Sequence, residues 1–291
     1  MNSITRKLIT GMLSLAFSFV ALGTVTFAWF TLTNITTLAP FELDVSTVEG
    51  IEVALGDETY SDEWFSDVPN HSFLSYLESL GYDNSFGLGH ITSPDGVNFI
   101  DFKSIGVDDR IKGGYLEFQL RFRSPVGGRN IYITNNTGIL SNPIAWKADA
   151  TFHNSKGTLI TAGEVVNYNV ANAVRMSFAS GDNVIVYELP DSEDNTAQGS
   201  TPQIAGAVEY YNTKHSLNPI SIDGVVLANT ITSFVDAPAV VILPKENPID
   251  GFYQATITIR IWIEGWDSDC IDALMQKKLT IALEFSTIKP E

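Results

Sequence analysis

Cysteine is almost missing from this chain of 291 residues, in which Cys270 is the only one. An exported protein that uses disulfides for stability carries its cysteines in pairs, so this protein must depend on a packed core. Apolar residues make up 44% of the chain, which is enough for such a core. We expect Cys270 to be a small buried apolar residue, with a reactive thiol or an intermolecular bridge as the alternatives.

Basic residues are also scarce, with 17 Lys and Arg against 34 Asp and Glu and a formal charge of −17. A phosphate backbone repels such a surface, so nucleic acid is not expected as a partner. The acidity fits a solvated surface or one that meets divalent cations. We expect no cofactor, with calcium as an alternative at two acidic clusters: Asp191, Glu193 and Asp194, and Asp267, Asp269 and Asp272. The second cluster lacks the glycine and final glutamate of an EF-hand loop, and helix capping accounts for its first two acids.

The local signatures of catalysis are missing too. No histidine lies in a His-Glu-x-x-His pattern, and the chain has no Gly-x-Ser-x-Gly elbow and no glycine-rich phosphate loop. Cys270 follows two acids in residues 266–270, which raises a thiol pKa and opposes a thiolate nucleophile. We therefore expect no catalytic residue, no metal ligand and no enzyme. The histidines are predicted to be isolated: His71, His90, His153 and His215.

The N-terminus carries an export signal. Arg6 and Lys7 precede an uncharged run over residues 8–32, and Thr26, Phe27 and Ala28 stand near its end. This order is typical of a signal peptide over residues 1–28 that is cut between Ala28 and Trp29, with Thr26 in the recognised sequence. The rest of the chain is predicted to be extracellular or on the cell surface, with a signal peptidase as processing partner.

Two other readings of the leader stay open. Uncut, the run of 25 residues at about 1.5 Å each could span a bilayer of roughly 30 Å as a helical anchor. A type IV pilin leader is the weaker alternative, because that class uses a glutamate early in its apolar helix and no acid precedes Glu42. In either case the membrane is met only through the N-terminal segment.

Period-two alternation of apolar and polar residues runs through most of the remaining sequence. It is clearest at 115–123, 253–263 and 279–285. Glycine, asparagine, aspartate and proline separate the segments, which is typical of an all-β antiparallel sandwich or jelly roll. The other predicted strands are 41–55, 130–134, 146–152, 165–179, 184–189, 224–227 and 240–243.

Helix is expected only as short connectors after the leader helix. Residues 71–80 show helical spacing, with Asn70 as a cap and Gly81 as a stop, and 268–277 are predicted to form a second helix. We expect a linker or donor strand over 29–40, then one β domain over 41–291 with a loop-rich insertion at about 57–110. Two domains are the alternative. Residues 190–205 are predicted to be a mobile loop, followed by a polar stretch at 207–223.

Three stretches carry a family resemblance: residues 26–31 with their continuation at 41–55, then 173–178, and then 261–270, Ile-Trp-Ile-Glu-Gly-Trp-Asp-Ser-Asp-Cys. Together they resemble exported Firmicutes and Mollicutes proteins that depend on a dedicated signal peptidase. The best-known of these are the biofilm-matrix fibre protein TasA and the camelysin-type surface proteins. The resemblance implies a jelly-roll domain on the cell surface or in the matrix. Camelysin relatives have been classed as metallopeptidases, but no metal motif is present here to carry that activity over.

In the fibre-forming relatives, the segment after the cleavage site inserts as a strand into the next subunit. Here that segment is residues 29–38, in which Phe30, Leu32 and Leu38 share a face and Trp29 is a further anchor. Such a strand would complete an open sheet edge by main-chain pairing. The alternatives are a flexible stalk, or pairing within the same subunit.

These observations favour a structural surface or matrix protein that forms filaments with copies of itself by N-terminal strand addition. An open-ended contact of this kind makes filaments rather than rings. The alternative is a monomeric anchored or secreted binding module for a glycan or another protein, for which exposed aromatic residues would speak. Its candidate residues are two pairs, Trp64 with Phe65 and Tyr210 with Tyr211. A secreted metallopeptidase is the least supported reading.

Overall fold

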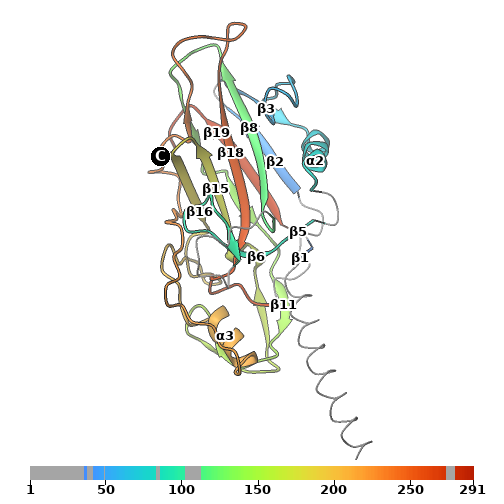
Figure 1. The fold of residues 1–291 in the computed structure, drawn as a ribbon, viewed down its shortest axis with the longest axis vertical. Helices are drawn as coiled ribbons and strands as arrows, with labels where there is room; N and C mark the ends of the chain where they lie inside the picture. The colour runs from blue at the N-terminus through green and yellow to red at the C-terminus, as the bar shows by residue number, and fades with distance from the viewer. Residues whose placement is uncertain (1–35, 38–41, 49, 83–85, 102–112, 273–278) are drawn as a thin grey trace, which may run out of the picture. The chain divides into compact units, whose positions relative to one another are not determined.

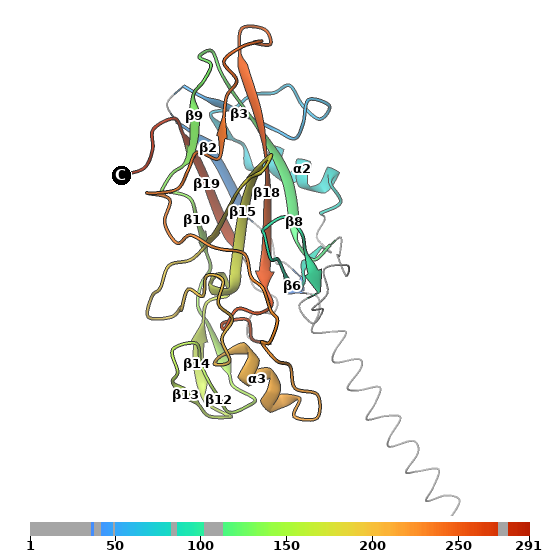
Figure 2. The same cartoon turned by 60° about the vertical axis from the view of Figure 1, so that its left-hand side comes forward.

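Strands dominate the computed structural model, which describes residues 36–37, 42–48, 50–82, 86–101, 113–272 and 279–291. Residues 36–291 form one compact unit, drawn in Figures 1 and 2. The leader, all of the donor segment except Thr36 and Thr37, and residues 273–277 of the second predicted helix lie outside the described residues. Within the described part, no helix is long and apolar enough to cross a bilayer.

The larger sheet is built around the longest strand, β18 (Tyr253–Glu264). One of its edges pairs with β15 (Val174–Ser180), and the other with β8 (Leu116–Ser124). The alternating apolar residues of these strands supply the buried face, as the sequence pattern predicts. The sheet is completed by β16 (Asn183–Glu188), β3 (Glu52–Leu55), β6 (His90–Thr92) and β7 (Ile100–Asp101).

The second sheet has six strands centred on β19 (Thr280–Ser286). It faces the first sheet across a shared core, in which the Phe285 ring lies 4.8 Å from that of Phe122 and 6.5 Å from that of Phe178, between centroids. The prediction of an all-β fold with packed sheets is therefore confirmed. The other strands of this sheet are β2 (Glu42–Thr47), β4 (Asp67–Val68), β9 (Asn130–Ile133), β10 (Gly138–Leu140) and β17 (Val241–Ile242).

The expectation of a wholly antiparallel framework is wrong in two places. β19 runs parallel to β2, and β18 runs parallel to β6. Each pair joins strands that are far apart in sequence, so no hairpin imposes an antiparallel direction. Alternation along a strand shows which residues face the core, but it does not show the direction of the neighbouring strand.

Several predicted strands are divided or missing. Residues 41–55 form two strands, because the chain turns at Gly50 with a φ of +69°. Residues 165–179 are interrupted by a 3-10 turn, η1 (Val170–Ala173). The side chain of Asn169 caps the start of this turn by accepting a hydrogen bond from the backbone N–H of Ala171. Residues 224–227 form no strand; they lie in a loop whose Leu227 side chain is nevertheless buried.

Both described helices are short. α2 (Asn70–Ser79) confirms the helix predicted at 71–80, and Gly81 with a φ of +90° follows its end. Asn70 is not its cap, because the helix begins after Pro69 and makes no side-chain cap bond. The sequence pattern does not indicate α3 (Ala207–Lys214), whose apolar face is only three residues wide within a polar stretch. At the second predicted helix, residues 268–271 are not helical and residue 272 is in a 3-10 conformation, while the rest of the predicted helix lies outside the described residues.

A smaller layer lies beyond the ends of the central strands and includes α3, as Figure 2 shows. Its own hydrophobic cluster packs Phe152, Tyr168 and Tyr210 with Ile271. Its strands pair two by two: β11 (Ile144–Lys147) with β14 (Val165–Tyr168), and β12 (Phe152–His153) with β13 (Leu159–Ile160).

Candidate functional site

The residues predicted for leader cleavage and strand donation fall outside the described part of the chain: Thr26, Ala28, Trp29, Phe30, Leu32 and Leu38. The described end of the donor segment is β1 (Thr36–Thr37), which pairs antiparallel with β5 (Gly87–Leu88). Leu88 is fully buried in the main core. The last part of the segment thus pairs within its own subunit in the single chain.

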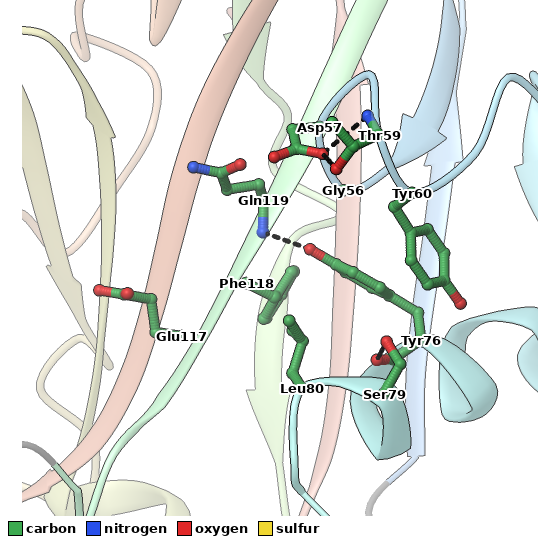
Figure 3. A pocket seen from close by; sticks show the side chains of 10 residues that line it. All are labelled: Gly56, Asp57, Thr59, Tyr60, Tyr76, Ser79, Leu80, Glu117, Phe118 and Gln119. Carbon is green, nitrogen blue, oxygen red and sulfur yellow. Dashed lines mark hydrogen bonds between the residues drawn. The ribbon is translucent and has the colours of Figure 1, made fainter.

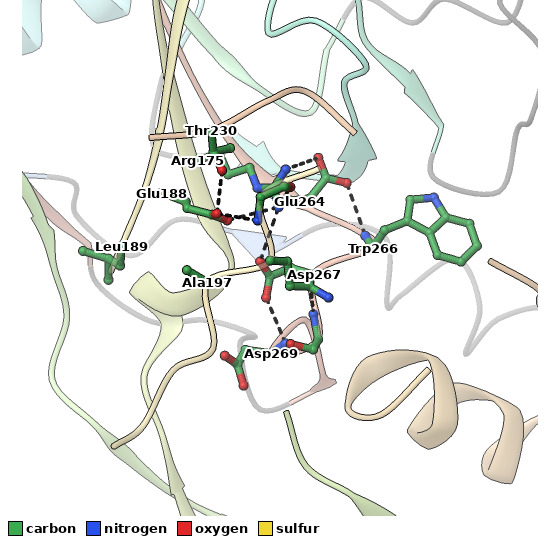
Figure 4. A network of polar contacts seen from close by, with 12 residues as sticks. Arg175, Glu188, Leu189, Ala197, Thr230, Glu264, Trp266, Asp267 and Asp269 are labelled. Atoms are coloured by element: carbon green, nitrogen blue, oxygen red, sulfur yellow. Dashed lines mark hydrogen bonds and ion pairs between the residues drawn. The ribbon is translucent and has the colours of Figure 1, made fainter. Parts of the chain in front are cut away.

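The most highly charged buried place in the described structure surrounds Arg175 of β15 (Figure 4). Its side chain is 0% exposed, although it lies between Val174 and Met176 in an otherwise uncharged strand. The register of the sheet places Glu188 of β16 directly opposite it. Sequence reasoning missed this pair, because two strands must be in register before the charges meet. The signal available in the sequence is Arg175 itself, the only charged residue of this strand.

Three carboxylates share the Arg175 guanidinium. Its Nη2 atom lies 3.2 Å from Glu188 Oε2 and 3.9 Å from Asp267 Oδ2, and its Nη1 atom lies 4.0 Å from Glu264 Oε2. Nη2 also donates to the carbonyl oxygen of Gly199 at 3.2 Å. Only the contact to Glu188 is short enough for a charge-assisted hydrogen bond, so the other two pairs act through charge alone.

The acids of the network are also held by neighbouring donors. Glu188 Oε1 accepts from the backbone N–H of Gly199 at 2.6 Å and from the hydroxyl of Thr230 at 2.5 Å. Glu264 Oε2 accepts from the Trp262 indole N–H at 3.1 Å. Gln198 Oε1 accepts from the backbone N–H of Ser268 at 2.9 Å. The predicted mobile loop at 190–205 is therefore tied into the network through residues 198 and 199.

Buried negative charge exceeds buried positive charge here. Burial raises the pKa of the Glu264 carboxyl, and it raises that of Asp267 well above the usual range even though Arg175 opposes the shift. Burial also raises the pKa of Asp269 to about 6, against hydrogen bonds from Ser155 and Thr196 that lower it. Since all of these groups are buried, the arrangement works as an internal clamp rather than as a surface for substrate.

One of the three stretches that carry the family resemblance, residues 261–270, contacts all four hydrophobic clusters of the described structure. Ile261 and Ile263 belong to the main core, while Trp262 and Trp266 each enter a different smaller cluster. Cys270 packs against both the main core and the cluster beside α3. Burial and the neighbouring acids raise its thiol pKa, as expected for a cysteine that serves packing rather than nucleophilic attack.

Of the two acidic clusters considered for calcium, the one formed by Asp267, Asp269 and Asp272 has its carboxylates in separate environments. Asp267 faces Arg175, while Asp272 Oδ2 is bonded to Lys214 Nζ and the Tyr210 hydroxyl at 2.7 and 2.8 Å. Asp269 Oδ2 has no hydrogen-bond partner among the described residues. Within that same part of the chain, no three His, Cys, Asp or Glu side chains are grouped so that they could hold a metal ion.

The aromatic residues proposed for a binding module differ in their exposure and contacts. Tyr210 is 4% exposed and packs against Phe152, and Phe65 packs on the main core. Trp64 is half-buried, and the guanidinium carbons of Arg121 and Arg123 lie 4.9 and 4.4 Å from its ring centroid. Phe65 and Tyr210 therefore serve packing, whereas Trp64 lines a cleft together with Arg121 and Arg123. Tyr211 is half-buried, and its ring centroid lies 4.4 Å from that of His215.

No protein-family model, curated protein or solved structure matches this chain. Its function must therefore be inferred from the chemistry and geometry of its own residues.

Replacing Asp269 with asparagine should stabilise the protein at neutral pH. Its folded pKa of about 6 is above the value of 3.8 for an exposed aspartate, so the folded state binds the proton more tightly. This group's contribution therefore makes stability fall as the pH rises from about 4 to about 6 and level off above that. At one pKa unit per 1.36 kcal/mol, the ionised carboxylate costs on the order of 2–3 kcal/mol at pH 7.

Urea unfolding at about pH 4.5 and pH 7.5 measures this effect. The stabilisation by Asp269→Asn should be larger at pH 7.5 than at pH 4.5. Asp182→Asn, at an exposed position, should leave the free energy of unfolding unchanged at both pH values. An Asp269→Asn protein that loses stability at pH 7.5 would contradict the assignment.

Proposed function

We propose that this protein is a structural component of the cell surface or extracellular matrix, exported by its leader and assembled into filaments by donation of residues 29–38. A signal peptidase would release Trp29 as the first residue. The proposal rests on the order of the leader residues, on the alternating apolar residues that come after them, and on the all-β framework that receives them.

The pairing of β1 with β5 carries the proposal. Thr36 and Thr37 already lie as a strand, but through only two residue pairs, with Leu88 and Gly87. A neighbour's segment can make the same contacts, so exchange between subunits costs little once the concentration is high. Because the donated end and the receiving edge are different surfaces, the contact repeats head to tail and the assembly stays open.

A jelly-roll topology is part of the proposal. Consecutive strands cross repeatedly between the two sheets: β2 and β3 lie in opposite sheets, as do β8 and β9, and β18 and β19. This crossing is typical of double-sheet folds of the jelly-roll type. It leaves strand edges at the margins of both sheets, which is what strand addition requires.

Deleting residues 29–35 from a protein that begins at Trp29 should abolish filaments in negative-stain microscopy. The deletion keeps β1, so the circular dichroism spectrum and the unfolding midpoint should stay unchanged. A matched control replaces residues 29–35 with a Gly/Ser segment of equal length, which should also prevent filaments if apolar pairing is required.

A synthetic peptide of residues 29–38 should cap growing filaments, while a scrambled peptide should not. Filaments that persist after the deletion would contradict strand donation. So would dispersed particles of the intact protein whose N-terminal residue is confirmed as Trp29.

A further inference from the structure

A cleft of about 450 Å³ opens between β8, α2 and the turn that follows β3 (Figure 3). Its volume lies within the range of small-molecule sites, roughly 300–1,000 Å³. Ten residues line it: Gly56, Asp57, Thr59, Tyr60, Tyr76, Ser79, Leu80, Glu117, Phe118 and Gln119.

The cleft exists because β3 is shorter than β8. β3 pairs with β8 only from Leu120 to Arg123, so the edge of β8 at residues 117–119 has no neighbouring strand. Tyrosine hydroxyls take its place: the N–H of Gln119 donates to Tyr76 at 3.1 Å, and the N–H of Glu117 donates to Tyr82 at 3.0 Å. The backbone N–H groups of this edge are thus hydrogen-bonded although no strand pairs with it.

Tyr60 gives the cleft an aromatic wall. Its side chain is 41% exposed, and its ring centroid lies 4.6 Å from that of Tyr76 at an interplanar angle of 52°. The turn is shaped for it: Gly56 has a φ of +72°, and an added Cβ would lie 2.8 Å from the Tyr60 Cβ. Tyr60 is therefore held in place while much of its ring faces solvent.

Polar groups surround this wall. Hydrogen bonds from Thr59 lower the pKa of Asp57, so its carboxylate is ionised at neutral pH. The Glu117 carboxylate is paired with Arg260 Nε at 2.5 Å and is still part of the lining. The Gln119 side-chain amide makes no hydrogen bond within the described part of the chain and can donate and accept.

We propose that this cleft binds a neutral saccharide. A sugar ring presents a C–H face that can pack on Tyr60, and hydroxyls that can donate to Asp57 and bond Gln119. Two carboxylates in a chain of charge −17 disfavour acidic sugars and phosphates. A purely apolar ligand would leave the polar lining unpaired. This site is independent of the filament proposal and would let the surface protein adhere to a glycan.

Isothermal titration with cellohexaose, maltohexaose and chitohexaose tests the proposal, with oligogalacturonate as the acidic probe. At least one neutral probe should bind, and Tyr60→Ala should weaken that binding about tenfold, whereas Tyr60→Phe should retain it within about threefold. Tyr132→Ala, on β9 of the other sheet, should leave affinity unchanged. Circular dichroism of each variant checks that it folds.

Three results would overturn the proposal: no binding of any neutral probe at several millimolar, neutral binding that Tyr60→Ala leaves intact, or tighter binding of the acidic probe. Loss of saccharide binding with filaments preserved, or the reverse, separates this site from strand donation.

Discussion

Replacing Arg175 with methionine is expected to lower the free energy of unfolding by about 3–5 kcal/mol. The guanidinium is the positive charge that faces Glu188, Glu264 and Asp267, and all four side chains are buried. Methionine has a similar length and fills the space. The decrease in the free energy of unfolding therefore reports the cost of leaving the buried carboxylates without a positive partner, rather than the cost of a cavity. Chemical denaturation of the wild type and the variant gives the difference.

The variant should also respond differently to pH. Without Arg175, the buried carboxylates must take up protons or stay buried as unpaired anions, so the deficit should shrink as the pH falls. Converting the acids as well, in Arg175→Met with Glu264→Gln and Asp267→Asn, should recover much of the lost stability. A single variant within about 1 kcal/mol of the wild type at pH 7 would show that Arg175 does not hold this junction together.

Arg260→Met is the matched control. Arg260 is also on a central strand and pairs with Glu117 at 2.5 Å, but the Glu117 side chain is 41% exposed. Water can solvate Glu117 once its partner is gone, so the cost should stay at or below about 1 kcal/mol. The contrast between the two arginines isolates burial as the cause.

Replacing Gly206 with alanine is the second change with a large expected effect, on the order of 3 kcal/mol or more. An added Cβ would lie 2.1 Å from the Ser268 carbonyl oxygen, and the φ of +85° is itself unfavourable for alanine. The contact cannot relax locally, because Ala207 N–H donates to the same oxygen at 2.8 Å and Gly206 N–H donates to His153 O at 2.7 Å. Either α3 or the turn at 267–269 must move.

Gly157→Ala is the control that separates backbone strain at a positive φ from the steric clash of the added Cβ. Gly157 has a comparable φ of +78°, but an added Cβ there would meet nothing within 4 Å. Its substitution should cost only about 1–2 kcal/mol, the ordinary penalty for a left-handed residue. The difference in thermal midpoint between the two variants measures the steric term. Equal midpoints would mean that Ser268 yields freely and that α3 is not fixed to this turn.

Both changes act on the same turn, residues 265–270, where the clamp of Arg175 meets the helix beside the smaller cluster. We expect the clamp to fix the ends of the central strands and thereby the frame on which any assembly edge rests. It is a feature of stability, whereas the proposed saccharide cleft and donor segment lie on other parts of the chain.

Which residues lie on a buried face was readable from the sequence for the long strands. Alternation over 253–263 and 115–123 located β18 and β8 to within about a residue, because a half-buried strand must alternate. α2 was indicated by its helical spacing and the glycine after it.

The tertiary structure alone decided what came together. Arg175 and Glu188 meet because two strands pair in one register, and β2 and β19 run parallel although nothing in either strand states a direction. Tyr60 and Tyr76 form a cleft wall because β3 ends early, which is a mismatch between two strand lengths rather than a motif. Local patterns report how a residue meets a core or water, whereas pairing, direction and clefts depend on partners that are distant in sequence.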